Sequence, residues 1–155
     1  MRRCLVPTLL ALAAPAALSA RQSDTVPVLK VLEDFTGALR AKDSLGMRAL
    51  LHEHARFTLL RPAPGGGVRV NILDAASFPR LTADPKGPTY DEPIRHPKVT
   101  IDGDLATVWA EYQVRIDGRV SHCGYDAFDL VRHAGGWKIL NVSDTFRPEG
   151  CGAMW

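Results

Sequence analysis

Residues 104–151 read DLATVWAEYQVRIDGRVSHCGYDAFDLVRHAGGWKILNVSDTFRPEGC and contain three long runs of the kind found in β-strands. Asp117-Gly118 and Ala134-Gly135-Gly136 separate these runs, and glycine accepts the positive φ angle that tight hairpin turns require. The first run, residues 105–116, alternates apolar and polar side chains with a period of two, which is typical of a strand with one buried face. The stretch therefore predicts consecutive antiparallel strands joined by hairpins.

Two large apolar side chains, Leu105 and Trp109, fall on the polar side of the first run. They indicate that this face is also partly covered, by a ligand cavity, a second protomer or a helix. The second run, residues 119–133, carries His122 and Asp126 on the face that also holds Phe128. Because alternate residues of a strand point to the same side, both polar side chains are expected to face the core.

The register of the first hairpin stays open. A two-residue turn at Asp117-Gly118 places Trp109 and Glu111 on the side of His122, and a bulged turn places Tyr112 there instead.

For the second hairpin we expect a three-residue loop at 134–136. This loop pairs apolar with apolar residues, Leu130 with Leu140 and Phe128 with Val142, and it places Asp126 opposite Asp144. A loop one residue shorter or longer would turn the last strand over, so the proximity of the two aspartates depends on the loop length.

The N-terminus has the pattern of a secretory signal peptide over residues 1–20. Arg2 and Arg3 precede an apolar run that is too short to cross a bilayer comfortably, and small residues follow it. The alternative is an uncleaved anchor. We expect an exported protein, periplasmic or secreted, with no stable membrane insertion after processing.

The chain has 19 Lys and Arg and 17 Asp and Glu, and removing residues 1–20 takes away two arginines and no acid. The mature chain is then neutral and has no basic cluster, so we expect no nucleic-acid partner. Residues 24–151 form one predicted domain, long enough for a real core, and residues 152–155 form a tail.

Two cysteines remain after processing, Cys123 and Cys151. An even number of cysteines in an exported protein predicts a disulfide between them, and two free thiols are the alternative.

The remaining elements follow from periodicity and turn residues. Val28, Leu32, Phe35 and Leu39 recur at helical spacing. They predict a helix over 26–41 with Asp24 as its N-cap and Pro27 in its first turn. A second helix is expected from Asp43 or Ser44 through Leu51, with strands at 55–60, 68–73 and 99–101 and a short helix at 74–81 that Pro79 ends or kinks. A long loop is expected at 82–93, and long loops in compact domains are often lids or binding loops. The order predicts an α+β fold with helices on one face of a curved antiparallel sheet.

Three segments resemble the nuclear transport factor 2-like superfamily, which includes SnoaL-like and ketosteroid isomerase-like proteins. They are D-G-D-L-A-T-V-W at 102–109, D-G-R-V-S-H-C-G-x-D-A-F at 117–128, and G-W-K-I followed by D-T-x-R-x-E-G-C at 136–151. The chain is similar to exported bacterial proteins of the lumazine-binding type. The resemblance implies a cone-shaped domain with a pocket between sheet and helices. It also implies a homodimer through the outer face of the sheet, and it implies no single chemistry.

Asp126 and Asp144 are candidates for an acid/base pair, because desolvation and a neighbouring like charge both keep a carboxyl protonated. The alternative is a structural role in which neighbouring hydroxyls such as Ser143 and Thr145 satisfy them. His122 is expected to be a hydrogen-bonded pocket histidine rather than a general base. Its neighbour Cys123 points to the opposite face, so the two cannot act as a nucleophile pair.

Other candidate sites are weaker. His52 and His54 lack the spacing that places two histidines on one helical face, and no third ligand is evident, so we expect no metal site. Arg61 is expected on the solvated surface, with an anionic ligand group as the alternative.

Two functions fit these residues. The first is a small-molecule-binding domain with a partly apolar pocket, lined by some of Trp109, Tyr112, His122, Asp126, Phe128 and Asp144. The second is an isomerase, cyclase or dehydratase without a cofactor, in which Asp126, Asp144 or His122 moves a proton next to a carbonyl. A purely structural dimer module is a third reading.

Overall fold

The computed structural model describes residues 16–154, with side chains described for residues 25–152. The predicted signal peptide, residues 1–20, lies largely outside this part of the chain and stays a prediction. Among the described residues, no helix is both long enough and apolar enough to cross a membrane.

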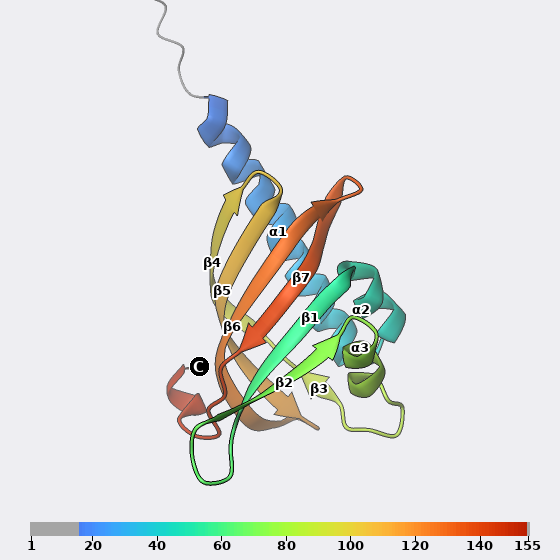
Figure 1. Cartoon of the computed structure of the whole chain (residues 1–155), viewed down its shortest axis with the longest axis vertical. Helices are drawn as coiled ribbons and strands as arrows, with labels where there is room; N and C mark the ends of the chain where they lie inside the picture. The colour runs from blue at the N-terminus through green and yellow to red at the C-terminus, as the bar shows by residue number, and fades with distance from the viewer. Residues whose placement is uncertain (1–15, 155) are drawn as a thin grey trace, which may run out of the picture.

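Two helices lead the chain and a third follows the first two strands (Figure 1). They are α1 (Ala16–Arg40), α2 (Ser44–Leu50) and α3 (Ser77–Thr82), and a short 3-10 helix, Cys151–Met154, lies at the end. The apolar stripe predicted for α1 is confirmed, because Val28, Leu32, Phe35 and Leu39 are all buried. The expected start of α1 is wrong: the helix begins at Ala16. Asp24 is therefore not its N-cap, since good helix formers such as Ala and Leu precede it.

Helix α2 matches its predicted position closely, whereas α3 begins at Ser77, three residues after its expected start at Asp74. Asp43 caps α2 by accepting a hydrogen bond from the backbone N–H of Gly46 at 2.8 Å. Pro79 lies inside α3 and does not end it. As the third residue of the helix, Pro79 lacks an N–H that would have had no partner within the helix anyway.

Seven strands form one curved sheet in the order β2-β1-β7-β6-β5-β3, with β4 also paired to β5. The strands are β1 (Leu51–Pro62), β2 (Val68–Asp74), β3 (Tyr90–Asp91), β4 (Ile94–Asp102), β5 (Leu105–Ile116), β6 (Arg119–His133) and β7 (Gly136–Asp144). Strands β4 to β7 are consecutive and antiparallel, as predicted. The β1–β7 pair is parallel, so the sheet is mixed rather than wholly antiparallel.

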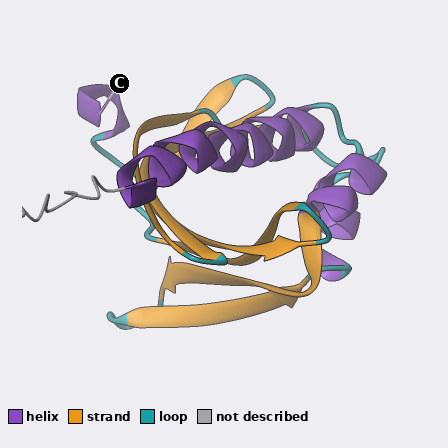
Figure 2. Ribbon diagram, turned by 90° about the horizontal axis from the view of Figure 1, so that it is seen from above, coloured by secondary structure: helices purple, strands orange, loops and turns teal. Residues whose placement is uncertain are grey.

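Helix α1 crosses the concave side of the sheet, which curves around it (Figure 2). The main core lies between them, from Val28 and Leu32 on α1 to Val108, Phe128 and Ile139 on the strands. The predicted α+β class with helices on one face of a curved sheet is therefore confirmed.

The β5–β6 and β6–β7 hairpins each combine a two-residue turn with a bulge. At Asp117-Gly118, both turn residues have positive φ angles, 49° and 78°. The register then shifts between Val114 and Arg115, so that Val114 pairs with His122. This is the bulged alternative, and it places Tyr112 and His122 on the same face of the sheet.

The second hairpin also turns through two residues, Ala134 and Gly135, because His133 pairs with Gly136. The expected three-residue loop is therefore wrong. A bulge between Asp129 and Leu130 supplies the missing residue, so Leu130 pairs with Ile139 instead of Leu140. Beyond the bulge, the predicted pairs Phe128–Val142 and Asp126–Asp144 are confirmed.

Candidate functional site: a cavity with an aromatic end and an acidic end

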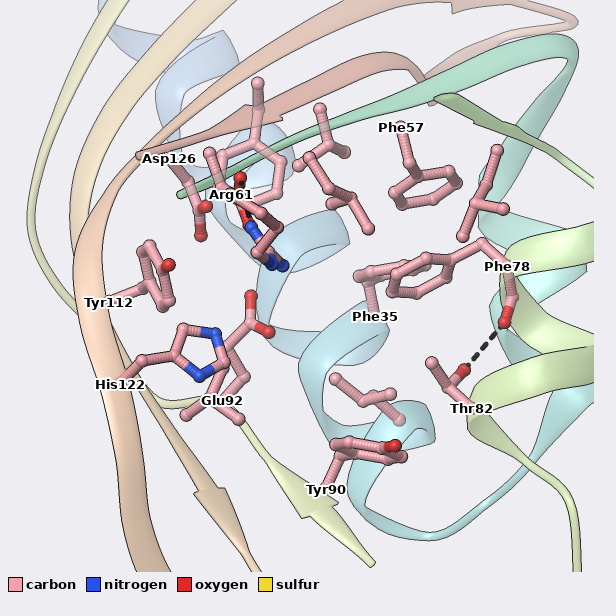
Figure 3. Close-up of a pocket in the computed structure, with 17 residues that line it drawn as sticks. Phe35, Phe57, Arg61, Phe78, Thr82, Tyr90, Glu92, Tyr112, His122 and Asp126 are labelled. Carbon is pink, nitrogen blue, oxygen red and sulfur yellow. Dashed lines mark hydrogen bonds and ion pairs between the residues drawn. The ribbon is translucent and has the colours of Figure 1, made fainter. Parts of the chain in front are cut away.

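A cavity of about 210 Å³ lies between the concave face of the sheet and the helices α1 and α3. Phe35, Phe57 and Phe78 gather on one side of it, and the other side holds Arg61, Glu92, Tyr112, His122 and Asp126 (Figure 3), together with Asp144, the ion-pair partner of Arg61. We call these two groups of residues the aromatic end and the acidic end. Val114, Phe128 and Val142 from the sheet also line the cavity.

The aromatic end is a stack of three rings from three elements. The rings of Phe57 on β1 and Phe78 on α3 are nearly parallel, 5° apart, with centroids 3.9 Å from each other. Phe35 on α1 lies 6.0 Å from each of them. Aromatic contacts of this kind add to the stability that apolar burial provides, so this end is a firm apolar wall.

Asp144, at the end of β7, accepts hydrogen bonds from two residues of β1. One guanidinium nitrogen of Arg61, Nη1, donates to both carboxylate oxygens at 2.8 and 2.7 Å, and the backbone N–H of Leu60 donates to Oδ1 at 2.8 Å. Burial raises the pKa of Asp144 above its usual value, although these hydrogen bonds act in the opposite direction. Asp144 is therefore an acid with its own cation and no free oxygen.

Asp126, on β6, interacts with an acid that follows β3. Asp126 is 1% exposed, and it shares a hydrogen bond with the carboxyl group of Glu92. Burial, followed by the charges of Glu92 and Asp144, raises its pKa well above the usual value. Burial and the charge of Asp144 also raise the pKa of Glu92 to about 7. The pair therefore holds a proton near neutral pH, because two adjacent buried carboxylates repel each other.

Tyr112 and His122 complete the acidic end. The hydroxyl of Tyr112 donates to the backbone oxygen of Thr145 at 2.6 Å, and its ring meets that of His122 edge-on at 5.8 Å. Burial and the charge of Arg61 lower the pKa of His122 to about 4, so the imidazole is neutral at pH 7. Its Nδ1 lies 3.1 Å from the hydroxyl of Ser121.

Gly124 allows Tyr112 to lie this close to β7. A Cβ atom at Gly124 would lie 2.3 Å from the backbone oxygen of Thr145 and 2.9 Å from the ring of Tyr112. No side chain fits there without moving the backbone or the tyrosine.

The cavity brings together five of the six pocket residues predicted from the sequence, Tyr112, His122, Asp126, Phe128 and Asp144. Trp109 is not among them. It lies on the outer face, 45% exposed, and stacks on Tyr125 at 5.1 Å, because the bulge in the first hairpin puts Tyr112 on the side of His122. Whether the five bind a ligand stays a prediction, as does a homodimer through the outer face.

Two residues of the acidic end were missed. Arg61 was expected on the surface, but its side chain is 22% exposed and lies in the cavity. Glu92 belongs to the long loop that was expected at 82–93, the kind of loop that often forms a lid or a binding loop. A short antiparallel pairing with β5 holds this loop in place, with Asp91 opposite Arg115. The sequence signal was an acid in a proline-rich loop, Asp91-Glu92-Pro93.

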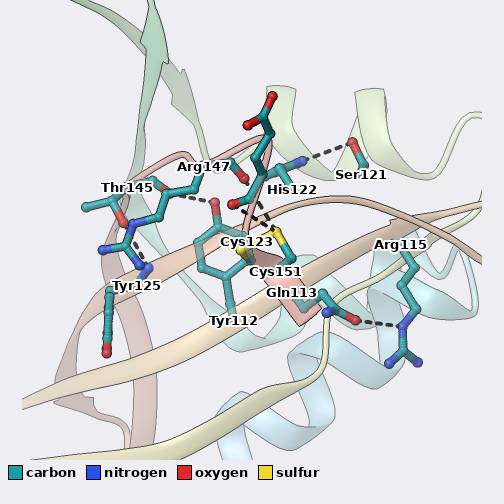
Figure 4. Close-up of a disulfide and its surroundings, with 11 residues drawn as sticks. Tyr112, Gln113, Arg115, Ser121, His122, Cys123, Tyr125, Thr145, Arg147 and Cys151 are labelled. Carbon is teal, nitrogen blue, oxygen red and sulfur yellow. Dashed lines mark hydrogen bonds between the residues drawn. A yellow bond between two sulfur atoms is a disulfide. The ribbon is translucent and has the colours of Figure 1, made fainter. Parts of the chain in front are cut away.

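The predicted disulfide between Cys123 and Cys151 is present, with the two Cα atoms 5.6 Å apart (Figure 4). Cys123 also pairs with Arg147 through two backbone hydrogen bonds, of 3.0 and 2.9 Å. The segment after β7 is thus joined to β6 at Cys123, the residue that follows His122. Among the described residues, no group of three or more His, Cys, Asp and Glu side chains is arranged to hold a metal ion.

No protein-family profile matches the chain, and no curated protein matches it either. Solved structures do. A nuclear transport factor 2-like protein from Cytophaga hutchinsonii superposes with a TM-score of 0.65 at 15% identity, covering 81% of this chain and 98% of that one. The fold is nuclear transport factor 2-like. The resemblance seen in the sequence is therefore confirmed at the level of the fold.

Two further structural neighbours have different descriptions. A protein of unknown function from Mycobacterium tuberculosis superposes with a TM-score of 0.70 at 13% identity, covering 90% of this chain and 81% of that one. A candidate scytalone dehydratase from Novosphingobium aromaticivorans superposes with a TM-score of 0.61 at 11% identity, covering 81% and 85%. At such identities the likeness extends to the fold alone.

Proposed function

We propose that the protein is exported and binds a small, partly aromatic molecule in the cavity. The single observation that carries this proposal is a cavity of about 210 Å³ with a stacked aromatic wall at one end and buried hydrogen-bonding groups at the other. Ligand sites are typically concave and largely apolar, with a few polar groups that fix orientation. The disulfide supports export, because such bonds persist mainly in oxidising compartments.

The size of the cavity supports a ligand over imperfect packing. Protein interiors are packed about as densely as organic crystals, with few voids larger than a water molecule. The long side chains around this cavity, such as Leu59 and Leu73, do not fill it.

Equilibrium dialysis of 2-naphthol tests the proposal. We expect saturable binding of one molecule per chain. Thr82→Trp, which places an indole at the cavity wall on α3, should weaken binding by about tenfold or more, because a filled pocket excludes the probe. Leu81→Trp, at an exposed neighbouring position, is the matched control and should bind as the parent does. The absence of saturable binding, or equal binding by both variants, would refute the proposal.

A second candidate function is proton transfer next to a carbonyl group. The specific observation is the Asp126–Glu92 pair, because general acid/base catalysis works best when a pKa lies near the working pH. In such a step the Glu92 carboxylate takes a proton from the carbon next to the carbonyl. The enolate oxygen accepts a hydrogen bond from protonated Asp126, the Glu92 carboxyl exchanges its proton with solvent, and Glu92 then returns a solvent-derived proton to the carbon. One solved structure with this fold is described as a candidate scytalone dehydratase, which supports this second candidate only through the shared fold.

Deuterium uptake by 1-tetralone in D₂O, followed by mass spectrometry, tests this second candidate. We expect faster uptake with the protein than in buffer and a loss of that acceleration in Glu92→Gln. Asp129→Asn is the control, since Asp129 does not line the cavity. If Glu92→Gln exchanges deuterium as fast as the parent, the candidate is wrong.

A further inference from the structure

The acidic end holds more negative groups than cations. Three acids from three parts of the chain line it, Glu92, Asp126 and Asp144, and Arg61 is the only lysine or arginine among the described residues that line the cavity. Arg61 is used by Asp144, since its Nη1 lies within 2.8 Å of both oxygens. Glu92 and Asp126 are left without a cation of their own.

One oxygen of this pair is poorly satisfied. Asp126 Oδ2 is buried, and apart from the proton that Asp126 shares with Glu92 no described residue donates a hydrogen bond to it. Buried polar atoms of native proteins nearly always have a partner, and an unsatisfied one costs free energy. Because Asp126 lines the cavity, this oxygen is accessible to a donor placed there.

The Tyr112 hydroxyl and Nη1 of Arg61 donate to acceptors other than Asp126 and Glu92. The hydroxyl of Tyr112 donates to Thr145, and the Arg61 guanidinium donates to Asp144 and to the backbone oxygen of Leu60. The neutral ring of His122 is paired with Ser121 and adds no charge. A positively charged donor in the cavity would therefore satisfy Asp126 Oδ2 and also compensate the charge of Asp126 and Glu92.

We propose that the ligand carries a protonated amine or amidinium group, which binds Asp126 and Glu92 while its apolar part packs against Phe35, Phe57 and Phe78. This inference rests on the proposed small-molecule site and names its ligand class. A neutral hydroxyl would satisfy Asp126 Oδ2 alone. A cationic N–H group satisfies that oxygen and also compensates the carboxylates, and hydrogen bonds between ionised groups are the stronger kind.

Binding of a cation should change the protonation of the acidic end. Burial and the charges of Asp144 and Asp91 raise the pKa of Glu92 and so oppose its ionisation, whereas the hydrogen bond from Asp126 and the charge of Arg61 lower the pKa and favour it. Tyr112 and His122 lie at the same end of the cavity. A bound cation favours ionised carboxylates, so its binding releases protons, and its affinity rises as the pH increases through about 7, the pKa of Glu92.

Three probes that differ only in their terminal group test the inference by isothermal titration calorimetry: 4-phenylbutylamine, 4-phenylbutanol and 4-phenylbutyrate. At pH 8 we expect the amine to bind about tenfold or more tightly than the alcohol, and the carboxylate to bind most weakly. At pH 6.5, titrations in buffers of different ionisation enthalpy should show proton release with the amine and none with the alcohol.

Variants separate charge from shape. Glu92→Gln should weaken amine binding by about tenfold and leave alcohol binding nearly unchanged, because only the charge at that position is lost. Asp126→Asn should weaken amine binding as well. Asp129→Asn removes one negative charge from the same strand outside the cavity, and it should bind all probes as the parent does.

The outcomes distinguish the inference from the function on which it rests. If the alcohol binds as tightly as the amine, or if Glu92→Gln weakens both equally, the cationic ligand class is wrong and the small-molecule site stands. If no probe binds, and 2-naphthol does not bind either, both proposals fail.

Discussion

At one end of the cavity three phenylalanine rings stack on one another, and at the other end two carboxyl groups share a hydrogen bond while a third is paired with an arginine. The first arrangement stabilises the fold whether or not a ligand is present, because it buries apolar area. The second opposes folding at neutral pH, because buried acids lose hydration and repel each other. A buried acid pair of this kind in a cavity marks a candidate functional site, which agrees with the ligand site proposed above.

The largest expected effect is at the aromatic end. Phe57→Ala should lower the free energy of unfolding by about 3 to 5 kcal/mol, because Phe57 is 1% exposed and its ring stacks on Phe78. Urea unfolding measures this change. Phe146→Ala, which removes a partly buried ring from the far side of His122, should cost less. If Phe57→Ala loses no more than Phe146→Ala, the aromatic end is not the firm wall that the comparison requires.

The next effect has the opposite sign and depends on pH. Glu92→Gln should raise the free energy of unfolding at pH 8 by up to about 3 kcal/mol, since burial moves the pKa of Glu92 from 4.5 to about 7. The unfolded chain loses this proton at lower pH than the folded one, so the parent loses stability as the pH rises from 4.5 to 7. Below pH 4.5 the two proteins should be equally stable.

Urea unfolding at pH 4, 6 and 8 measures this difference. Glu149→Gln, at an exposed position outside the cavity, should show no such trend. A Glu92→Gln variant that is less stable than the parent at pH 8 would mean that the acidic end stabilises the fold.

A smaller effect is expected where the backbone positions Tyr112. Gly124→Ala should cost roughly 1 to 3 kcal/mol, because the added methyl group overlaps the backbone oxygen of Thr145 and the tyrosine ring. Thermal unfolding measures the loss, and 2-naphthol binding should weaken with it. Gly136→Ala is the control, as a Cβ there meets nothing within 4 Å. Equal losses for both alanines would contradict the role given to Gly124.

The smallest effect concerns one hydrogen bond. Tyr112→Phe should cost about 1 kcal/mol, because it removes the donor to the Thr145 oxygen and leaves the ring in place. Chemical denaturation detects a loss of this size. A loss well above that of Gly124→Ala would show that the hydroxyl, and not the ring packing, holds the acidic end together.

Much of the fold could be predicted from residue patterns. The stripe of Val28, Leu32, Phe35 and Leu39 predicts α1 and its buried face, since a helix repeats every 3.6 residues. Alternation along β6 predicts that Asp126 and Phe128 face inward, since a strand repeats every two. The pairing of Asp126 with Asp144 was predicted correctly although the expected loop length was wrong. The bulge between Asp129 and Leu130 restores the register that a three-residue loop would have given.

The sequence by itself determined most of the elements, their buried faces and the inward direction of Asp126 and Phe128 on β6, because each depends on spacing along one strand or helix. It also determined the disulfide partners, because only two cysteines follow the predicted signal peptide. Only the tertiary structure decided which acid partners Asp126, that Arg61 lies in the cavity, and that Trp109 lies outside it. Glu92 and Asp126 are 34 residues apart in the chain. Such contacts depend on bulges and on the path of a loop, and these shift with a single residue that no periodic pattern records.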